Sequence, residues 1–485
     1  MPIESIIGRQ DEVAILDKLW KSKEAEFLAL YGRRRVGKTH LIHSYFSEKS
    51  VYFELTGIKD AKLHVQLTNF AKLLSKVFYD GLSISCPKNW LDAFEMLTHA
   101  MQKQSKSKKI VLFFDELPWL AGRRSGITQA LDYYWNTVWS RCPHLIVIAC
   151  GSAASWMLDN LINAKAGLHN RLTKVIHLQP LNLKQTREFL SHRKITYTPI
   201  QILDLYMAIG GIPYYLKQIE RGKSVTQNIN ALCFDPNGFL YSEFERLFRS
   251  LFDKADIHLQ IVRELAKYRY GRPRSELINA LKIESGGTLT KRLMELQAAG
   301  FVKSFVPYGN KNRDLYYRIV DEYAQFYLQW IEPVKEHNIQ GSGYWEKTVS
   351  NPARASWAGL AFEAVCFKHL EQIRNGLGLK NIVHATGWWR YLPPKGTSDK
   401  GAQVDLLFDR EDKTISLCEI KYSDKPFVID KSYAKILADK IQTFQQHLNP
   451  AKSLSLIMIT SAGVKENIWC DELIEGQISL EQLFQ

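Results

Sequence analysis

Residues 27–39 read Phe-Leu-Ala-Leu-Tyr-Gly-Arg-Arg-Arg-Val-Gly-Lys-Thr, an apolar run followed by the pattern G-x-x-x-x-G-K-T. The run predicts a buried strand, and we expect a helix to begin near Lys38. In such a loop the glycines let backbone amides close on phosphate oxygens, the lysine reaches the β- and γ-phosphates, and the Thr39 hydroxyl offers a ligand to Mg²⁺. The alternative, a chance glycine turn, is disfavoured by the flanking strand and helix. The residues expected to contact a nucleotide here are Gly32, Arg33, Arg34, Arg35, Val36, Gly37, Lys38, Thr39 and His40.

A second polar element ends the apolar run Val111-Leu-Phe-Phe, which is followed by Asp115 and Glu116. We expect Asp115 to share the Mg²⁺ shell with Thr39, and Glu116 to orient and polarise the water that attacks the γ-phosphate. By itself, an acidic pair at a strand end is as often a solvated terminus. Beside a phosphate loop, the pair predicts hydrolysis of a nucleoside triphosphate.

The chain has 485 residues, of which 46% are hydrophobic and 24% charged, which is typical of a globular protein with several cores. Apolar runs at 27–31, 51–55, 110–114 and 145–150 alternate with amphipathic stretches, and this alternation predicts a parallel α/β sheet. Helical spacing of leucines and aromatic residues follows, then short helices and a predicted hairpin. The predicted parts are 1–181, the α/β core; 182–252, a helical lid subdomain; 253–325, a winged helix-turn-helix; 326–349, a helical connector; and 350–485, a mixed α/β domain.

Neither a membrane segment nor a secretory signal is expected. No stretch reaches the ~18 to 20 uninterrupted apolar residues that cross a bilayer. The start, Met1-Pro2-Ile3-Glu4, lacks a basic segment followed by an apolar one. Seven widely spaced cysteines without a C-x-x-C pair indicate neither a disulfide framework nor a zinc site. We therefore expect a cytoplasmic protein.

Together the motifs resemble those of the AAA+ ATPases, and within them an archaeal and bacterial group placed near the STAND signalling ATPases. The resemblance covers roughly residues 5 to 250, and the segments that carry it are Ile7-Gly8-Arg9, residues 31–39, Asp115-Glu116, Ile148-Ala-Cys-Gly-Ser152, Leu168-His-Asn-Arg171 and Gly210-Gly-Ile-Pro213-Tyr. It implies a P-loop AAA+ sheet with a helical lid, binding ATP with Mg²⁺.

The same resemblance assigns roles to residues outside the phosphate loop. Gly8 and Arg9 would border the nucleotide, and Ser152 would be the polar sensor that follows a strand. Arg171 would contact a γ-phosphate, within the subunit or from a neighbour, although a surface ion pair is an equal alternative. Pro213 would lie in the lid segment that reports the bound nucleotide, with a plain helix break as the alternative. No unambiguous sensor arginine is found in the lid, so slow hydrolysis or a nucleotide switch stays open.

Residues 257–319 concentrate positive charge. The whole chain has 64 Lys and Arg against 50 Asp and Glu, a net charge of +14, and this segment alone carries twelve basic and five acidic residues. Ser285 begins a predicted recognition helix that contains Lys291 and Arg292. Four more basic residues near predicted helix starts or the wing are Arg272, Arg274, Lys311 and Arg313. Phosphate contacts with DNA need such a concentration, although winged helices also serve as protein-binding modules.

A third signal lies near the C-terminus, in Gly401-Ala-Gln403-Val-Asp405-Leu-Leu-Phe and Ser416-Leu-Cys-Glu419-Ile-Lys421. On the two strands of a hairpin these side chains would share one face. Two carboxylates and a lysine are suited to metal-assisted hydrolysis of phosphodiesters, with Asp405 and Glu419 as metal ligands and Lys421 positioning water.

This constellation resembles the PD-(D/E)XK nuclease superfamily over about residues 350 to 465, which implies a restriction-endonuclease-like α/β domain. Glu363, in a predicted helix, matches the acidic residue that many members carry on their first core helix, and Gln403 could reach the metal or the substrate. An ordinary exposed hairpin is the alternative. In comparable ATPase fusions the fold also serves as a binding module, so catalysis stays open.

Two functions fit these patterns. The first is an AAA+ protein that binds and hydrolyses Mg·ATP, binds DNA and cleaves it in the C-terminal domain with a further Mg²⁺ or Mn²⁺. The second is a STAND-like nucleotide-switched regulator or scaffold whose nuclease-like domain is a non-catalytic binding module. A second copy of the chain, bound through the ATPase module, or a separate protein would then be the partner.

Overall fold

The computed structural model describes residues 6–105, 107–122, 124–163, 168–283, 286–310, 315–337, 343–394, 396, 401–448 and 451–485. The described chain divides into two compact units: residues up to Pro180 with Arg249–Asp253 and Met294–Gly300, and Leu181–Phe248 with Lys254–Leu293 and Phe301–Gln485. The predicted functional residues Ser285, Lys311 and Arg313 lie outside the described ranges. Within those ranges, no helix combines the length and the apolar character that crossing a bilayer requires.

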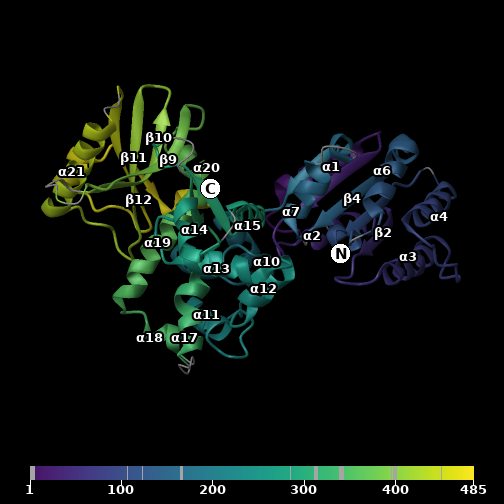
Figure 1. The fold of residues 1–485 in the computed structure, drawn as a ribbon. Helices are drawn as coiled ribbons and strands as arrows, with labels where there is room; N and C mark the ends of the chain where they lie inside the picture. The colour runs from purple at the N-terminus through teal and green to yellow at the C-terminus, as the bar shows by residue number, and fades with distance from the viewer. Residues whose placement is uncertain are drawn as a thin grey trace. The chain divides into compact units, whose positions relative to one another are not determined.

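The first unit contains a parallel sheet with the strand order β2-β3-β4-β1-β5 (Figure 1). Its strands are β1 (Glu26–Tyr31), β2 (Val51–Thr56), β3 (Ile110–Asp115), β4 (Leu145–Gly151) and β5 (Lys174–His177). Strands β3 and β4 are buried along their whole length, as apolar strands covered on both faces are. The predicted strands coincide with β1 to β4. Strand β5 escapes prediction because three of its four residues are exposed and it lacks an apolar run.

Helices surround this sheet and close its core. They are α1 (Gln10–Lys21), α2 (Lys38–Phe46), α3 (Leu63–Phe78), α4 (Trp90–Gln102), α5 (Leu117–Leu120), α6 (Ile127–Thr137), η2 (Trp139–Arg141), α7 (Ala154–Met157), η3 (Leu158–Ile162) and η4 (Leu168–Arg171). Aromatic side chains from α3, α4 and α6 pack with the sheet, and Phe94 contacts the rings of Phe114 and Trp139. The Trp139 indole nitrogen donates to Thr98 Oγ1 at 2.9 Å, so this buried polar group is satisfied.

The strand order positions the candidate site. Strand β4 lies between β1 and β3 and runs parallel to both, with Tyr31 opposite Gly151. The carboxyl ends of β1, β3 and β4 therefore meet at one edge of the sheet. Ligands of open α/β sheets bind beyond this edge.

The second unit begins with α8 (Leu183–His192), α9 (Pro199–Ile209), α10 (Pro213–Leu216), α11 (Val225–Cys233) and α12 (Glu243–Leu251), in agreement with the helical segment predicted over 182–252. Asn182 and Gln185 form a capping box that starts α8. A Cβ on Gly211 would lie 1.7 Å from the Leu181 carbonyl oxygen, so only glycine permits this approach.

Residues 255–319 follow as a helical group with a small antiparallel sheet of order β6-β8-β7. The elements are α13 (Ala255–Ala266), β6 (Arg272–Pro273), α14 (Arg274–Leu281), α15 (Gly286–Ala298), β7 (Val302–Phe305) and β8 (Tyr316–Ile319). Strands β7 and β8 form the hairpin expected from the sequence, with Val302 opposite Ile319. The connector consists of α16 (Glu322–Phe326), η5 (Tyr327–Ile331), α17 (Glu332–Glu336) and α18 (Tyr344–Lys347).

The C-terminal part has a mixed sheet of order β13-β12-β11-β10-β9, coloured green to yellow in Figure 1. Strands β9, β10 and β11 are antiparallel neighbours, whereas β11, β12 and β13 are parallel. Helix α19 packs against β11 and helix α21 against β10. The elements are α19 (Pro352–Lys368), α20 (Leu370–Gly376), β9 (Val383–Tyr391), β10 (Ala402–Arg410), β11 (Thr414–Lys421), α21 (Lys431–Leu448), β12 (Ser453–Thr460), α22 (Ile468–Leu473), β13 (Gly476–Ser479) and η6 (Leu480–Phe484).

Candidate nucleotide site and a second acidic centre

The loop between β1 and α2 begins and ends at a glycine, and both glycines have a positive φ. Gly32 has a φ of +152°, and a Cβ there would lie 2.3 Å from the Leu178 carbonyl oxygen. Gly37 has a φ of +95° and caps the start of α2. Arg35, between them, is also left-handed at +74°. The loop leads into the N-terminus of α2, where free backbone amides favour phosphate oxygens.

Lys38 is buried in this loop and its amine has protein partners. Its Nζ donates to the carbonyl oxygens of Gly32 (3.0 Å) and Arg33 (3.2 Å) and to Ser152 Oγ (2.8 Å). Only 5% of the residue is exposed. The amine is therefore held where the loop closes, at the position from which the sequence predicts a contact with phosphate oxygens.

Thr39 and Asp115, the two residues predicted to bind Mg²⁺, contact each other. The Thr39 hydroxyl donates to Asp115 Oδ2 at 2.8 Å. Burial raises the pKa of Asp115, and the Thr39 hydrogen bond partly offsets this. A hydroxyl and one carboxylate, completed by phosphates and water, are the donor set that Mg²⁺ uses in phosphoryl-transfer sites. These residues fit the predicted ion.

Glu116 is oriented by Ser152. The backbone of Glu116 is left-handed, with a φ of +49°. Its Oε2 accepts from the Ser152 backbone N–H at 3.0 Å, and its Oε1 accepts from Ser152 Oγ at 2.5 Å. Ser152 therefore contacts both Lys38, which follows the loop after β1, and Glu116, which follows β3.

The structure also brings the N-terminal segment to the phosphate loop. Gly8 has a φ of +66°. Arg9 is buried and donates from Nη2 to the Val36 carbonyl oxygen at 3.0 Å, and it pairs with Glu12 at 3.3 Å. Burial lowers the pKa of Arg9, although the nearby Glu12 carboxylate raises it.

Four further residues are predicted to contact the nucleotide: Arg34, His40, Arg171 and Pro213. His40 contacts Ser44 Oγ within α2 at 3.3 Å, and the Arg34 guanidinium lies 5.8 Å from the Trp119 ring centroid. Arg171 is exposed at the end of η4, and Pro213 opens α10 in the other compact unit. Among described residues, the hydrogen bonds that join the phosphate loop to β3 and β4 do not include Arg171 or Pro213.

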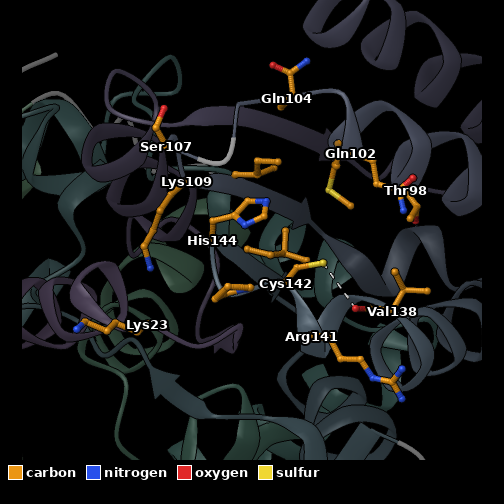
Figure 2. A pocket seen from close by; sticks show the side chains of 14 residues that line it. Lys23, Thr98, Gln102, Gln104, Ser107, Lys109, Val138, Arg141, Cys142 and His144 are labelled. Carbon is orange, nitrogen blue, oxygen red and sulfur yellow. Dashed lines mark hydrogen bonds between the residues drawn. The ribbon is translucent and has the colours of Figure 1, made fainter.

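A cavity of about 690 Å³ lies at the opposite edge of this sheet, where β3 and β4 begin (Figure 2). It is lined by Lys23, Lys109, Arg141, Cys142 and His144 together with other polar and apolar side chains, and within the described ranges none of its lining residues belongs to the phosphate loop. Lys109 is held by the Ser22 carbonyl oxygen at 2.6 Å. The cavity is thus separate from the candidate nucleotide site.

The predicted C-terminal residues also come together. Asp405 on β10 and Glu419 on β11 lie on neighbouring antiparallel strands. Gln403 donates to Asp405 Oδ1 at 3.0 Å, and the Ile420 backbone N–H donates to Oδ2 at 3.1 Å. Lys421 Nζ lies 2.9 Å from Glu419 Oε1. The sequence pattern therefore anticipates this acidic centre.

Several partners of the centre carry no signal in the sequence. Glu419 also accepts from Tyr433 OH at 2.6 Å and pairs with Lys440, both on α21. Glu363 on α19 pairs with Arg269 from the loop between α13 and β6 at 2.5 Å. Tyr433 and Lys440 follow Glu419 by 14 and 21 positions and Arg269 is far from the motif along the chain, and only the packing of α21 and of that loop brings these side chains to the centre.

The electrostatics follow from burial and these pairs. Burial raises the pKa of Asp405 to about 7, and the nearby Glu419 and Glu363 carboxylates act in the same direction. Burial opposes ionisation of Glu419, yet Lys440 and Lys421 outweigh it and lower its pKa. Burial also raises the pKa of Glu363 in spite of Arg269.

Within the described ranges, no three His, Cys, Asp or Glu side chains are grouped so that they could hold a metal ion. Glu363 and Glu419 instead face cations of their own chain. In this arrangement the predicted nuclease-like metal site, with Asp405 and Glu419 as ligands, is not formed.

The strand order, the glycine-bounded loop and the Lys38, Thr39, Asp115 and Glu116 cluster define the first unit as a P-loop nucleotide-binding domain. Residues 7–219 match the sequence model of a family described as an ATPase domain predominantly from Archaea. This part of the chain is therefore similar to the ATPase domains of this family.

Three proteins illustrate the similarity. An uncharacterized protein of Methanocaldococcus jannaschii, MJECL04, is 23% identical over 440 residues, covering 89% of this chain and 90% of that protein. The Walker-type ATPase PABY2304 of Pyrococcus abyssi aligns with a TM-score of 0.47 and 19% identity, over 68% of this chain and 97% of that one. The Aeropyrum pernix ORC2 protein, in ADPNP and ADP complexes, aligns with a TM-score of 0.38 and 13% identity, over 68% and 94%.

Proposed function

We propose that the protein binds and hydrolyses Mg·ATP in its P-loop domain and uses the nucleotide to control a DNA-binding C-terminal half. The observation that carries the first part is the meeting of Lys38, Thr39, Asp115 and Glu116 at one sheet edge, through Ser152 and the Thr39 hydroxyl. Positioning and electrostatics supply most of the rate in phosphoryl transfer, and these four side chains are among the groups that P-loop enzymes use for it.

In this proposal each residue of the site has its own role in binding the phosphates, holding the metal or activating water. Lys38 exchanges the Gly32 and Arg33 carbonyl oxygens for β- and γ-phosphate oxygens. Thr39 and Asp115 would hold Mg²⁺, which would neutralise charge on the phosphates. Glu116 orients water and takes up its proton, while Ser152 holds the carboxylate in place.

For residues 255–319, we propose a winged helix. The order of α13, β6, α14, α15, β7 and β8 and the antiparallel hairpin support it. Lys291 is exposed on α15 and suited to a phosphate contact. Arg272 instead pairs with Glu264 and Glu276, and Arg274 donates to Thr290 and Gly286, so neither is offered to DNA in this arrangement.

For the C-terminal part, we propose a restriction-endonuclease-like domain. The order α19, β9, β10, β11, α21, β12 and the meeting of Asp405, Glu419 and Lys421 support this assignment. On this assignment the domain would bind nucleic acid, and cleavage would require Asp405 and Glu419 to leave their present partners and hold a metal.

The ion pairs of Glu363 and Glu419 favour a second candidate, in which the domain binds without cutting and the protein acts as a nucleotide-driven switch.

The test combines binding and cleavage. Fluorescence anisotropy of labelled duplex DNA, measured with ATP and Mg²⁺ at several salt concentrations, should give an affinity that falls as salt rises. Plasmid nicking with Mg²⁺ or Mn²⁺ separates the candidates, since cutting that Glu419→Ala and Lys421→Ala abolish supports the nuclease and intact plasmid supports the switch. Absence of both ATP turnover and DNA binding would refute the proposal.

A further inference from the structure

The candidate nucleotide site uses one edge of the parallel sheet, and the cavity of about 690 Å³ lies at the other edge (Figure 2). Its lining includes Ile110 and Leu145, which are the first residues of β3 and β4. Asp115, at the far end of β3, belongs to the candidate nucleotide site. Six residues separate the two places by about 17 Å, at ~3.3 Å per residue. A ligand in the cavity therefore occupies a site of its own.

Several segments of the first unit meet at this cavity. They are the loop between α1 and β1, the last turns of α4 with the loop that leads to β3, the segment from the end of α6 through η2, and the turn before β4. Ligand pockets commonly enclose roughly 300 to 1,000 Å³. The cavity therefore has room for a small organic molecule.

The side chains around the cavity carry positive charge without a carboxylate. Lys23, Lys109 and Arg141 line it, and within the described ranges its lining contains no Asp or Glu. Lys109 is partly compensated, because its amine donates to the Ser22 carbonyl oxygen at 2.6 Å and the Glu26 carboxylate acts on it from outside the lining. Lys23 and Arg141 have no ion pair and no side-chain hydrogen bond with the part of the chain that the structure describes. Two cations are thus available to an anion.

Helix capping does not account for these two cations. Basic side chains near a helix C-terminus often donate to the carbonyl oxygens of its last turn. Helices α4 and η2 both end at the cavity. Among the described residues, however, neither Lys23 nor Arg141 donates to a carbonyl oxygen.

Apolar groups lie between the cations. Figure 2 shows Cys142 with Lys23 to one side and Arg141 to the other. The Cys142 thiol donates to the Val138 carbonyl oxygen at 3.6 Å, and Met101 adds further apolar surface. Lys23 and Arg141 are exposed, so they place positive charge at the rim. An apolar floor with a few polar groups around it is typical of sites that bind small molecules.

We propose that this cavity binds a small organic anion in which an acidic head group, a carboxylate or a phosphate, is joined to an apolar body. Lys23 and Arg141 attract the head group, and the body lies against Met101, Val138 and Cys142. The exposed cations alone would bind an anion weakly because water screens them, so burial of the apolar body supplies the remaining affinity. The site goes beyond the proposed function, since neither ATP hydrolysis nor DNA binding uses this edge of the sheet.

The test uses two probes that differ in charge. 8-Anilinonaphthalene-1-sulfonate (ANS) has an aromatic body and a sulfonate, and N-phenyl-1-naphthylamine is the same body without the sulfonate. Cys142 lines the cavity, whereas Cys86 is exposed and lies outside the lining. Alkylation of each thiol by iodoacetamide, followed by peptide mass spectrometry, therefore reports occupancy at the site itself. With ANS at about ten times its Kd, alkylation of Cys142 should slow about tenfold and that of Cys86 should stay unchanged.

The second measurement removes charges from the rim. Lys23→Ala and Arg141→Ala should each weaken ANS binding about threefold in a fluorescence titration, and N-phenyl-1-naphthylamine should bind both variants as it binds the wild type. Both side chains are exposed, so their loss leaves the packed core intact. Lys108→Ala is the matched control, because Lys108 is also exposed and precedes β3 but does not line the cavity. Its affinity for ANS should equal that of the wild type.

Competition identifies the head group. Displacement of ANS by 1-naphthoate supports a carboxylate ligand, and displacement by 1-naphthyl phosphate supports a phosphate ligand. The proposal is overturned if ANS protects neither cysteine or both alike. It is also overturned if Arg141→Ala weakens both probes equally, or if Lys108→Ala weakens ANS binding as much as Arg141→Ala does. If Cys142 does not react even without a probe, the titrations of the charge variants decide.

Discussion

Replacing Glu116 with glutamine separates nucleotide binding from hydrolysis in the P-loop domain. The glutamine side chain has the same shape, and its Oε1 can accept one of the two Ser152 hydrogen bonds that Glu116 accepts at 3.0 and 2.5 Å. The Lys38, Thr39 and Asp115 contacts do not involve Glu116. We therefore expect Glu116→Gln to retain nucleotide binding.

The magnitude follows from what is lost. An amide cannot take up the proton of the attacking water, and a general base contributes about 10²- to 10⁴-fold, or roughly 3 to 5 kcal/mol of transition-state stabilisation. The folded state loses one charge-assisted hydrogen bond, which lowers its stability by about 1 to 2 kcal/mol. Turnover should therefore fall at least about a hundredfold while the nucleotide Kd changes by less than about threefold.

The assay is steady-state phosphate release with Mg·ATP, paired with calorimetric titration of a non-hydrolysable ATP analogue. Lys38→Ala is the contrasting variant and should lose binding, because it removes the amine expected to pair with the β- and γ-phosphates. Turnover in Glu116→Gln above about a tenth of the wild-type rate would show that Glu116 is not the base. Loss of analogue binding in Glu116→Gln would show that the carboxylate belongs to the phosphate cradle.

Two further outcomes are expected. Ser152→Ala should lower kcat about tenfold with little change in nucleotide affinity, because Glu116 loses its contact with Ser152 Oγ. Ser152→Thr, which keeps a hydroxyl, should restore the rate. Equal rates in the wild type and both variants would contradict this positioning role. Burial raises the pKa of Asp204 to about 6 although Tyr422 OH donates to it at 2.6 Å, so its contribution to stability is present below about pH 4 and is lost as the pH rises through 6. The free energy of unfolding of Asp204→Asn, measured in urea, should therefore rise by about 3 kcal/mol relative to that of the wild type between pH 4 and pH 8. Parallel pH profiles of the two proteins would contradict this expectation.

Much of the first unit can be predicted from local sequence because its strands are continuous apolar runs and its loop is a contiguous motif. Strand β5 is the exception, since Lys174 and Val175 are exposed and the strand is recognisable only by its pairing with β1. Likewise, the role of Ser152 as the contact of both Lys38 and Glu116 needs β4 to lie between β1 and β3.

For the acidic centre, the sequence identifies the acids but not their neighbours. Asp405, Glu419 and Lys421 alternate along two adjacent strands, and a period of two places them on one face. Arg269 and Lys440 are basic residues without a motif, 136 positions before Asp405 and 21 positions after Glu419. Nothing local distinguishes them from other surface cations.

The sequence by itself determined the chemistry available: a phosphate-binding loop, a metal-binding acid, a base and a later group of carboxylates. These depend on residue type and on spacings of a few positions, which local backbone geometry fixes. Tertiary structure alone decided which partner each charged group pairs with, because ion pairs such as Arg269 with Glu363 form between segments far apart in the chain. Burial then sets the free-energy cost of leaving those charges unpaired, and the burial of each side chain is defined only in the packed fold.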